Sequence, residues 1–147
     1  MFKTYGLTHV ALAVADVERA AAFYQAALGM CVVYRDPSFV QLQTPATRDV
    51  LVLERDSKRA GKTGNIAHFG FRLERAADIG AAADAVSRAG GRIRDQGEFV
   101  PGEPYLFALD PDGNEVEIWY ELPTKIDPPA RRRASRARVR RRAGARA

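Results

Sequence analysis

The feature that most restricts the fold of this chain is an order of expected elements that occurs twice. Residues 7–15 are mostly apolar and β-branched, which predicts a buried strand, and residues 16–29 carry apolar side chains at helical spacing. Asp16 suits the N-cap of this helix, and Gly29 suits its end. Three short apolar runs separated by turn-forming residues then predict strands at 30–36, 39–44 and 49–55.

The same order begins again after a polar connector at 58–64. Residues 65–73 predict a strand, and residues 76–89 form an alanine-rich helical pattern that ends at two glycines. Further strands are expected at 91–97, 104–110 and 114–122, with a tight turn before the last one. The duplication predicts an α+β fold of two tandem βαβββ modules that form a curved mixed sheet around a metal-binding cleft.

The charge of the chain is divided unevenly between its body and its C-terminal end. The net charge is +5, but nine of the 23 basic residues are arginines beyond residue 127, where there is no acid. Residues 1–127 keep 14 basic and 18 acidic residues, a net charge of −4. We expect one domain at 1–127, with module one at 5–57 and module two at 64–122, followed by a disordered Arg-rich tail at 128–147. Nonspecific contact of this tail with nucleic acid is an alternative, secondary to the role of the domain.

Composition narrows the cellular setting. A hydrophobic content of 46% supports one core, and no apolar run reaches the length of a membrane span. The N-terminus lacks the apolar segment of a signal peptide. Cys31 is the only cysteine, so neither an intrachain disulfide nor a cysteine-rich zinc site can form. A cytoplasmic protein with no membrane association is expected.

Two histidines and one glutamate suggest a metal site. His9 and His68 stand near the start of the first strand in each half, among apolar neighbours where an imidazole needs a polar partner. Along the last strand, side chains alternate between faces, so Glu117 and Trp119 should face the cleft. Two imidazoles and a carboxylate form a facial triad that suits Fe(II) or Mn(II). We predict that His9, His68 and Glu117 bind one divalent metal; structural histidines and a solvated glutamate are the alternative.

Three segments carry a resemblance to a known family. GLTHVALAVADVERAAAFYQAALGM (6–30), NIAHFGFRL (65–73) and LDPDGNEVEIWYE (109–121) resemble the vicinal oxygen chelate superfamily. This group includes glyoxalase I, extradiol dioxygenases, fosfomycin-resistance enzymes and bleomycin-binding proteins. The resemblance implies a metal that chelates two adjacent oxygens of a small substrate, and by position His9, His68 and Glu117 match its ligands. One scaffold hosts many reactions, so the metal is implied more directly than the reaction.

No well-known branch of the family matches fully. The fourth, acidic ligand of glyoxalase I aligns with Val52, and Glu54 could replace it only if the register shifts by one pleat. Ala11 and Phe107 stand where the fosfomycin enzymes use a threonine and a tyrosine. Extradiol dioxygenases of larger size use an additional histidine, which is missing. Tyr105, Glu54 and a metal-bound water are therefore the candidates for proton transfer.

The expected function is that of a divalent-metal-dependent enzyme resembling extradiol dioxygenases and acting on a catechol-like substrate. A glyoxalase-I-like lyase or isomerase using Ni(II) or Zn(II) is the alternative enzyme, and a metal-free drug-binding protein is the alternative of another class. The resemblance also implies a homodimer, with His9 of one subunit beside His68 and Glu117 of the other. The expected apolar walls of the substrate pocket are Phe69, Phe71, Phe107 and Trp119.

Overall fold

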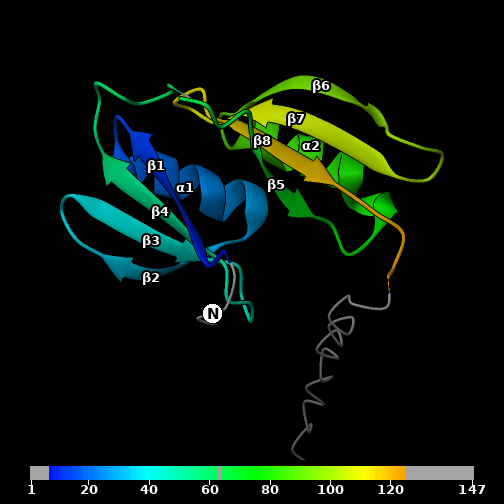
Figure 1. Cartoon of the computed structure of the whole chain (residues 1–147), viewed down its shortest axis with the longest axis horizontal. Coiled ribbons are helices and arrows are strands. Elements are labelled where there is room, and N and C mark those ends of the chain that lie inside the picture. The colour runs from blue at the N-terminus through cyan, green and yellow to red at the C-terminus, as the bar shows by residue number, and fades with distance from the viewer. Residues whose placement is uncertain (1–6, 63, 125–147) are drawn as a thin grey trace, which may run out of the picture.

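The computed structural model describes residues 7–62 and 64–124 and contains two four-stranded sheets, each accompanied by one α-helix (Figure 1). The predicted order βαβββ–βαβββ is confirmed, with a short 3-10 helix added before the second α-helix. The tail predicted at 128–147 lies outside the described residues. No helix within the described part of the chain is long and apolar enough to cross a membrane. The elements are β1 (His9–Val14), α1 (Val17–Leu28), β2 (Cys31–Arg35), β3 (Phe39–Gln43), β4 (Val50–Arg55), β5 (Phe69–Arg72), η1 (Ala76–Asp78), α2 (Ile79–Arg88), β6 (Arg92–Glu98), β7 (Pro104–Leu109) and β8 (Glu115–Trp119).

The two sheets have the same topology. The strand order is β1-β4-β3-β2 in the first sheet and β5-β8-β7-β6 in the second. The first strand of each half runs parallel to the last one, β1 with β4 and β5 with β8, and the remaining pairs are antiparallel. Positions in one half can therefore be matched to positions in the other through their strand partners.

Helix α1 has the ends that its sequence predicts. The Asp16 side chain accepts hydrogen bonds from the backbone N–H groups of Glu18 and Arg19, as an N-cap does. The bonds from Arg19 and then Glu18 lower the pKa of the Asp16 carboxyl. Gly29 ends the helix at φ 66°, a left-handed conformation that costs glycine little.

The helices cover one face of each sheet and pack against each other. Helix α1 contacts β3 and β4, α2 contacts β6 and β7, and α1 packs on α2. In β8, Val116 and Ile118 are buried on the helix side, as the alternation of the sequence predicts. We call the face of each sheet that the helices leave uncovered its outer face. In the second sheet the outer face carries Gly70, Tyr105, Phe107, Glu117 and Trp119, with His68 just before β5.

The turn between β7 and β8 also joins the two halves. The buried Asp110 carboxylate accepts hydrogen bonds from the backbone N–H groups of Asp112 and Asn114 and from the Asn114 amide. Its fourth donor is the Tyr24 hydroxyl of α1, at 2.8 Å. Burial, followed by the negative charge of Asp110, raises the pKa of Tyr24 well above its ordinary value. A motif that the sequence marks only as a tight turn therefore fixes module two to the first helix.

Candidate functional site

The structure brings His68 and Glu117 together on the outer face of the second sheet. His68 directly precedes β5, and its Nε2 lies 3.4 Å from Glu117 Oε2 in β8. The Glu117 side chain is 14% exposed, whereas that of His68 is 38% exposed. Phe107, the cross-strand partner of Glu117, contacts the imidazole edge to face with the ring centroids 5.1 Å apart. The pair therefore has a defined wall on one side and solvent on the other.

A glycine keeps the space above Glu117 open. Gly70 in β5 is the strand partner of Glu117, and a Cβ at this position would lie 3.1 Å from Glu117 Oε2 and 3.5 Å from the indole nitrogen of Trp119. Any larger side chain would occupy the space beside the carboxylate. Glycine within a strand often marks such a close approach of another group.

The His68–Glu117 pair fits two ligands of a single cation. With metal–ligand bonds of about 2.1 Å, two adjacent ligand atoms on one ion are separated by about 3 Å. The measured 3.4 Å between His68 Nε2 and Glu117 Oε2 is close to this spacing. An imidazole nitrogen and a carboxylate oxygen also match the donors preferred by Fe(II), Mn(II) and Zn(II).

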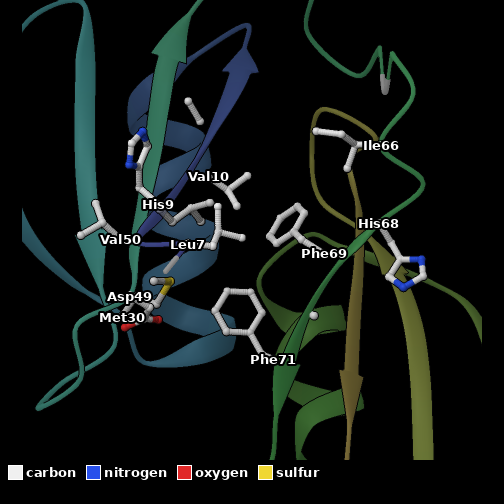
Figure 2. A pocket seen from close by; sticks show the side chains of 13 residues that line it. Leu7, His9, Val10, Met30, Asp49, Val50, Ile66, His68, Phe69 and Phe71 are labelled. Carbon is white, nitrogen blue, oxygen red and sulfur yellow. The ribbon is translucent and has the colours of Figure 1, made fainter. Parts of the chain in front are cut away.

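His9 lies on the other sheet, away from this pair. It is the first residue of β1, it is exposed, and its strand partner is Val50. In Figure 2 the rings of His9 and His68 point to opposite sides of the space between β1 and β5. Among residues 7–62 and 64–124, no group of three or more histidine, cysteine, aspartate or glutamate side chains is placed to hold a metal. One chain therefore does not assemble the predicted triad by itself.

From the sequence, the imidazoles are expected to need polar partners because their neighbours are apolar. This expectation is wrong. Both His9 and His68 are exposed, so neither ring needs a buried polar partner. The apolar neighbours Val10 and Phe69 point to the opposite side, toward the helices, because side chains alternate along a strand. The matching placement of the two histidines remains the stronger argument for a shared role.

The strand register decides which residue of the first half corresponds to Glu117. Gly70 pairs with Glu117 in the second sheet, and Ala11, two residues after His9, pairs with Val52 in the first. Val52, which the sequence aligned with the fourth ligand of glyoxalase I, is therefore the counterpart of Glu117, and it has no donor atom.

Glu54 does not replace Val52. It lies four residues along β4 from Val50, the strand partner of His9. At about 3.3 Å per residue, this places the backbones of Glu54 and His9 about 13 Å apart along the strand direction. Glu54 is an exposed acid in the position that Trp119 has in the other half.

The predicted aromatic walls divide between the two sides of the sheet. Phe107 and Trp119 lie on the outer face with Glu117, as predicted. Phe69 and Phe71 lie on the helix side, where they pack against the core and against each other with centroids 6.0 Å apart. Phe69 and Phe71 therefore point away from Glu117, because positions 69 and 71 alternate with His68 and Gly70 along the chain, but both line the cleft between β1 and β5.

Tyr105 lies on the outer face, farther from Glu117 than Phe107 is. Its partner across the strands is Trp119, and its hydroxyl donates to Asp95 Oδ2 at 3.2 Å. Desolvation, then the charge and the hydrogen bond of Asp95, raise the pKa of Tyr105. The phenol therefore keeps its proton at neutral pH and suits a hydrogen-bond donor better than a general base.

An apolar cleft of about 680 Å³ lies between β1 and β5 (Figure 2). Val10, Phe69 and Phe71 point into it from the two sides. At its rim, Leu7 is 90% exposed and Ile66 is 60% exposed. Both strands that border it are sheet edges with one unpaired side. The full lining is Leu7, His9, Val10, Ala11, Met30, Asp49, Val50, Leu51, Ile66, His68, Phe69, Gly70 and Phe71.

Sequence reasoning missed two charged residues beside the candidate ligands. Arg94 of β6 forms an ion pair with Glu115 of β8 at 2.5 Å, and its guanidinium lies 5.9 Å from the Phe107 ring centroid. Glu115 is 12% exposed, so it is not the solvated acid that its position in the sequence suggests. No local pattern predicts this pair, because β7 separates β6 from β8 in the sheet.

Comparisons with known proteins agree with this architecture. Residues 6–118 match the model of the Glyoxalase/Bleomycin resistance protein/Dioxygenase superfamily. The chain is 30% identical over 125 residues to the uncharacterized Pseudomonas aeruginosa protein PA2024, covering 80% of this chain and 89% of the relative. A glyoxalase-related enzyme from Fulvimarina pelagi has a similar structure (TM-score 0.67, 20% identity, 80% of this chain and 89% of the other). A lactoylglutathione lyase from Agrobacterium tumefaciens is also similar (TM-score 0.63, 20% identity, covering 80% of this chain and 94% of the other).

Proposed function

The chain belongs to the Glyoxalase/Bleomycin resistance protein/Dioxygenase superfamily, and from that premise we propose that it is a divalent-metal-dependent enzyme of the extradiol-dioxygenase type. The single observation that carries the proposal is the His68–Glu117 pair, with donor atoms 3.4 Å apart beneath an open position at Gly70. His9, in the corresponding place of the other half, supplies the third ligand. A bound Fe(II) would act as a Lewis acid toward two adjacent substrate oxygens and supply the site for O2.

The residues of the chain have distinct roles in this proposal. His68 and Glu117 hold the metal from one sheet, and His9 holds it from the other. Phe107 excludes water beside His68 and fixes the orientation of its ring through the 5.1 Å edge-to-face contact. Tyr105 keeps its proton, because its pKa is raised, and its hydroxyl donates to Asp95 beside Phe107 on the outer face.

The missing fourth ligand favours a dioxygenase over a glyoxalase-like lyase. Val52, the counterpart of Glu117, cannot bind a metal, and Glu54 is displaced from His9 along the strand. Three protein ligands leave about three positions of an octahedral ion open, which is what a chelated diol and O2 together require. A lyase that uses a fourth acidic ligand lacks that residue here.

We further propose that the enzyme is a homodimer with sites shared between subunits. In one chain the outer faces that carry His9 and His68 point apart (Figure 2). A second copy that places its first sheet over the second sheet of this chain would bring His9 to His68 and Glu117. The apolar cleft between β1 and β5, with Leu7 and Ile66 exposed at its rim, supports burial against that copy.

Metal binding by matched variants tests the ligand set. We expect Glu117→Gln to abolish stoichiometric binding of Fe(II), Mn(II) or Zn(II), measured by calorimetry and by metal analysis of purified protein. Glu54→Gln removes an acid from the opposite sheet and should leave metal affinity unchanged. If wild-type protein binds none of these metals, or if Glu54→Gln is the variant that loses them, the proposed ligand set is wrong.

Mixing two inactive variants tests the shared site. His9→Ala and Glu117→Gln each damage both sites of their own homodimer. A mixed dimer contains one site with His9, His68 and Glu117 all intact, so metal binding should return in part after joint refolding. Sites contained within one chain would give no recovery, and a monomer in analytical ultracentrifugation would also contradict the dimer.

Oxygen uptake tests the reaction. The Fe(II)-loaded protein should consume O2 with a panel of substituted catechols and yield the yellow ring-opened products. No uptake with any catechol, together with turnover of a hemithioacetal by the Ni(II)- or Zn(II)-loaded protein, would establish the lyase alternative instead.

A further inference from the structure

An irregularity in β6 turns two charged side chains toward the outer face of the second sheet. Ile93 pairs with Ala108, but Asp95 pairs with Phe107, so β6 advances by two residues while β7 advances by one. Arg94 is the extra residue of this bulge. Ile93 packs against the core, whereas Asp95 bonds the Tyr105 hydroxyl and Arg94 lies over the Phe107 ring. Bulges of this kind often re-aim side chains next to active sites.

Arg94 remains accessible although it has a partner. Its side chain is 54% exposed while its ion-pair partner, Glu115, is 12% exposed. A guanidinium carries five N–H donors, so one carboxylate does not use its full capacity. Arg72, on β5 of the same face, lies over the Trp119 ring at 6.0 Å, donates to the backbone carbonyl of Glu121 and pairs with the Glu121 carboxylate.

The position of Arg94 relative to the metal ligands is bounded by two measured distances. Its Cζ lies 5.9 Å from the Phe107 centroid, and that centroid lies 5.1 Å from the His68 centroid. Arg94 Cζ and the His68 ring are therefore at most 11.0 Å apart, with the apolar face of Phe107 between them. A benzene ring with a short acidic side chain can span this distance from the metal ligands to the guanidinium.

The aromatic side chains extend this surface. Tyr105 contacts Phe107 edge to face at 5.5 Å, and Phe99 stacks on Tyr105 at 4.2 Å. Phe99 is 52% exposed, so this row of rings runs from the β6–β7 hairpin to His68. An aromatic surface bordered by the accessible guanidinium of Arg94 matches a ligand with a planar ring and an anionic group.

We propose that Arg94 binds an anionic group of the substrate, so that the outer face of the second sheet takes small aromatic acids in preference to neutral aromatics. The inference rests on the proposed function for the identity of the reacting end of the substrate. Binding at Arg94 itself does not require the metal, so the two can be tested separately.

Binding of a matched pair of ligands tests the anion site. Phenylacetate and phenylacetamide have the same shape and differ in charge, and Trp119, the single tryptophan, lies on the same face as a fluorescence reporter. With the full-length, metal-free protein we expect phenylacetate to change the Trp119 emission with at least about tenfold higher affinity than the amide. Arg94→Gln should reduce the affinity for phenylacetate by about tenfold, which is ~1.4 kcal/mol, and leave that for phenylacetamide unchanged.

Arg88→Gln is the control, since it removes the same charge from the exposed end of α2 and should bind like wild type. A second readout uses Fe(II)-loaded protein. Arg94→Gln should raise the KM of a catechol with a carboxymethyl group and leave that of 4-methylcatechol unchanged.

The outcomes separate the inference from the proposed function. Equal affinity for the acid and the amide, or the same loss in Arg88→Gln as in Arg94→Gln, overturns the anion site even if catechols are oxidised. Arg94-dependent binding of phenylacetate by a protein that binds no metal and consumes no O2 supports the anion site and overturns the proposed reaction.

Discussion

The hydrogen bond between Tyr24 and Asp110 gives the sharpest test of how the two halves are held together. Tyr24→Phe removes only the hydroxyl that donates to Asp110 Oδ2 across 2.8 Å. The carboxylate keeps its other donors, the backbone N–H groups of Asp112 and Asn114 and the Asn114 amide, so no buried acceptor atom is left without a partner. Tyr24 itself is 0% exposed, and water cannot replace the lost partner in the folded state.

The expected cost follows from this geometry. A hydrogen bond to a charged group contributes about 1.5–3 kcal/mol to the free energy of unfolding. A domain of this size loses about 4 °C in Tm per kcal/mol, so the variant should melt roughly 6–12 °C below wild type. Tyr34→Phe is the matched control, because Tyr34 is 50% exposed and its loss should stay within about 0.5 kcal/mol.

The stability difference between wild type and Tyr24→Phe should also depend on pH in the alkaline range. Burial raises the pKa of Tyr24 well above 10, so the folded protein keeps the proton where the unfolded chain releases it. The stabilisation by the hydroxyl is complete below the unfolded value near 10 and declines as the pH rises toward the folded value. The stability difference between wild type and Tyr24→Phe, measured by urea unfolding, should therefore narrow above pH 10. Equal stability of the two proteins at pH 7 would refute the reasoning.

Three glycines give further predictions. Gly70→Ala places a Cβ 3.1 Å from Glu117 Oε2. The variant should bind the metal at least about tenfold more weakly in calorimetry, while its circular dichroism spectrum stays unchanged. Undiminished metal affinity would contradict the role of the open position above Glu117. Gly61→Ala places a Cβ 2.2 Å from the Asp112 backbone oxygen at φ +70°, and should destabilise the fold by more than Gly64→Ala, where φ is +58° and no atom lies within 4 Å. The Gly64 variant should cost about 1–2 kcal/mol from its backbone conformation alone, and equal urea midpoints for the two would show that the contact with Asp112 has no energetic weight.

The local order of elements could be predicted from the sequence, because it depends on short-range patterns. Asp16 and Gly29 fix the ends of α1 through bonds to residues at most five positions away. Alternation in β8 buries Val116 and Ile118 and turns Glu117 to the outer face. The sequence also aligned Val52 with the fourth ligand of glyoxalase I, and the strand register then makes it the counterpart of Glu117.

The composition of the site was decided by tertiary structure. Whether Phe69 and Phe71 face the ligands depends on which side of β5 the helices cover, and whether Arg94 reaches Phe107 depends on a one-residue bulge. Both are long-range choices that local periodicity does not encode.

The proposed metal ligands also show what the sequence determined and what the tertiary structure decided. The sequence alone placed His9 and His68 at matching positions of two similar halves and Glu117 on the open face of its strand. The structure brought His68 to within 3.4 Å of Glu117 and directed His9 to the other side of the chain. The physical reason is the packing of α1 against α2, which turns the inner faces of the sheets toward each other and leaves their outer faces for another surface to cover.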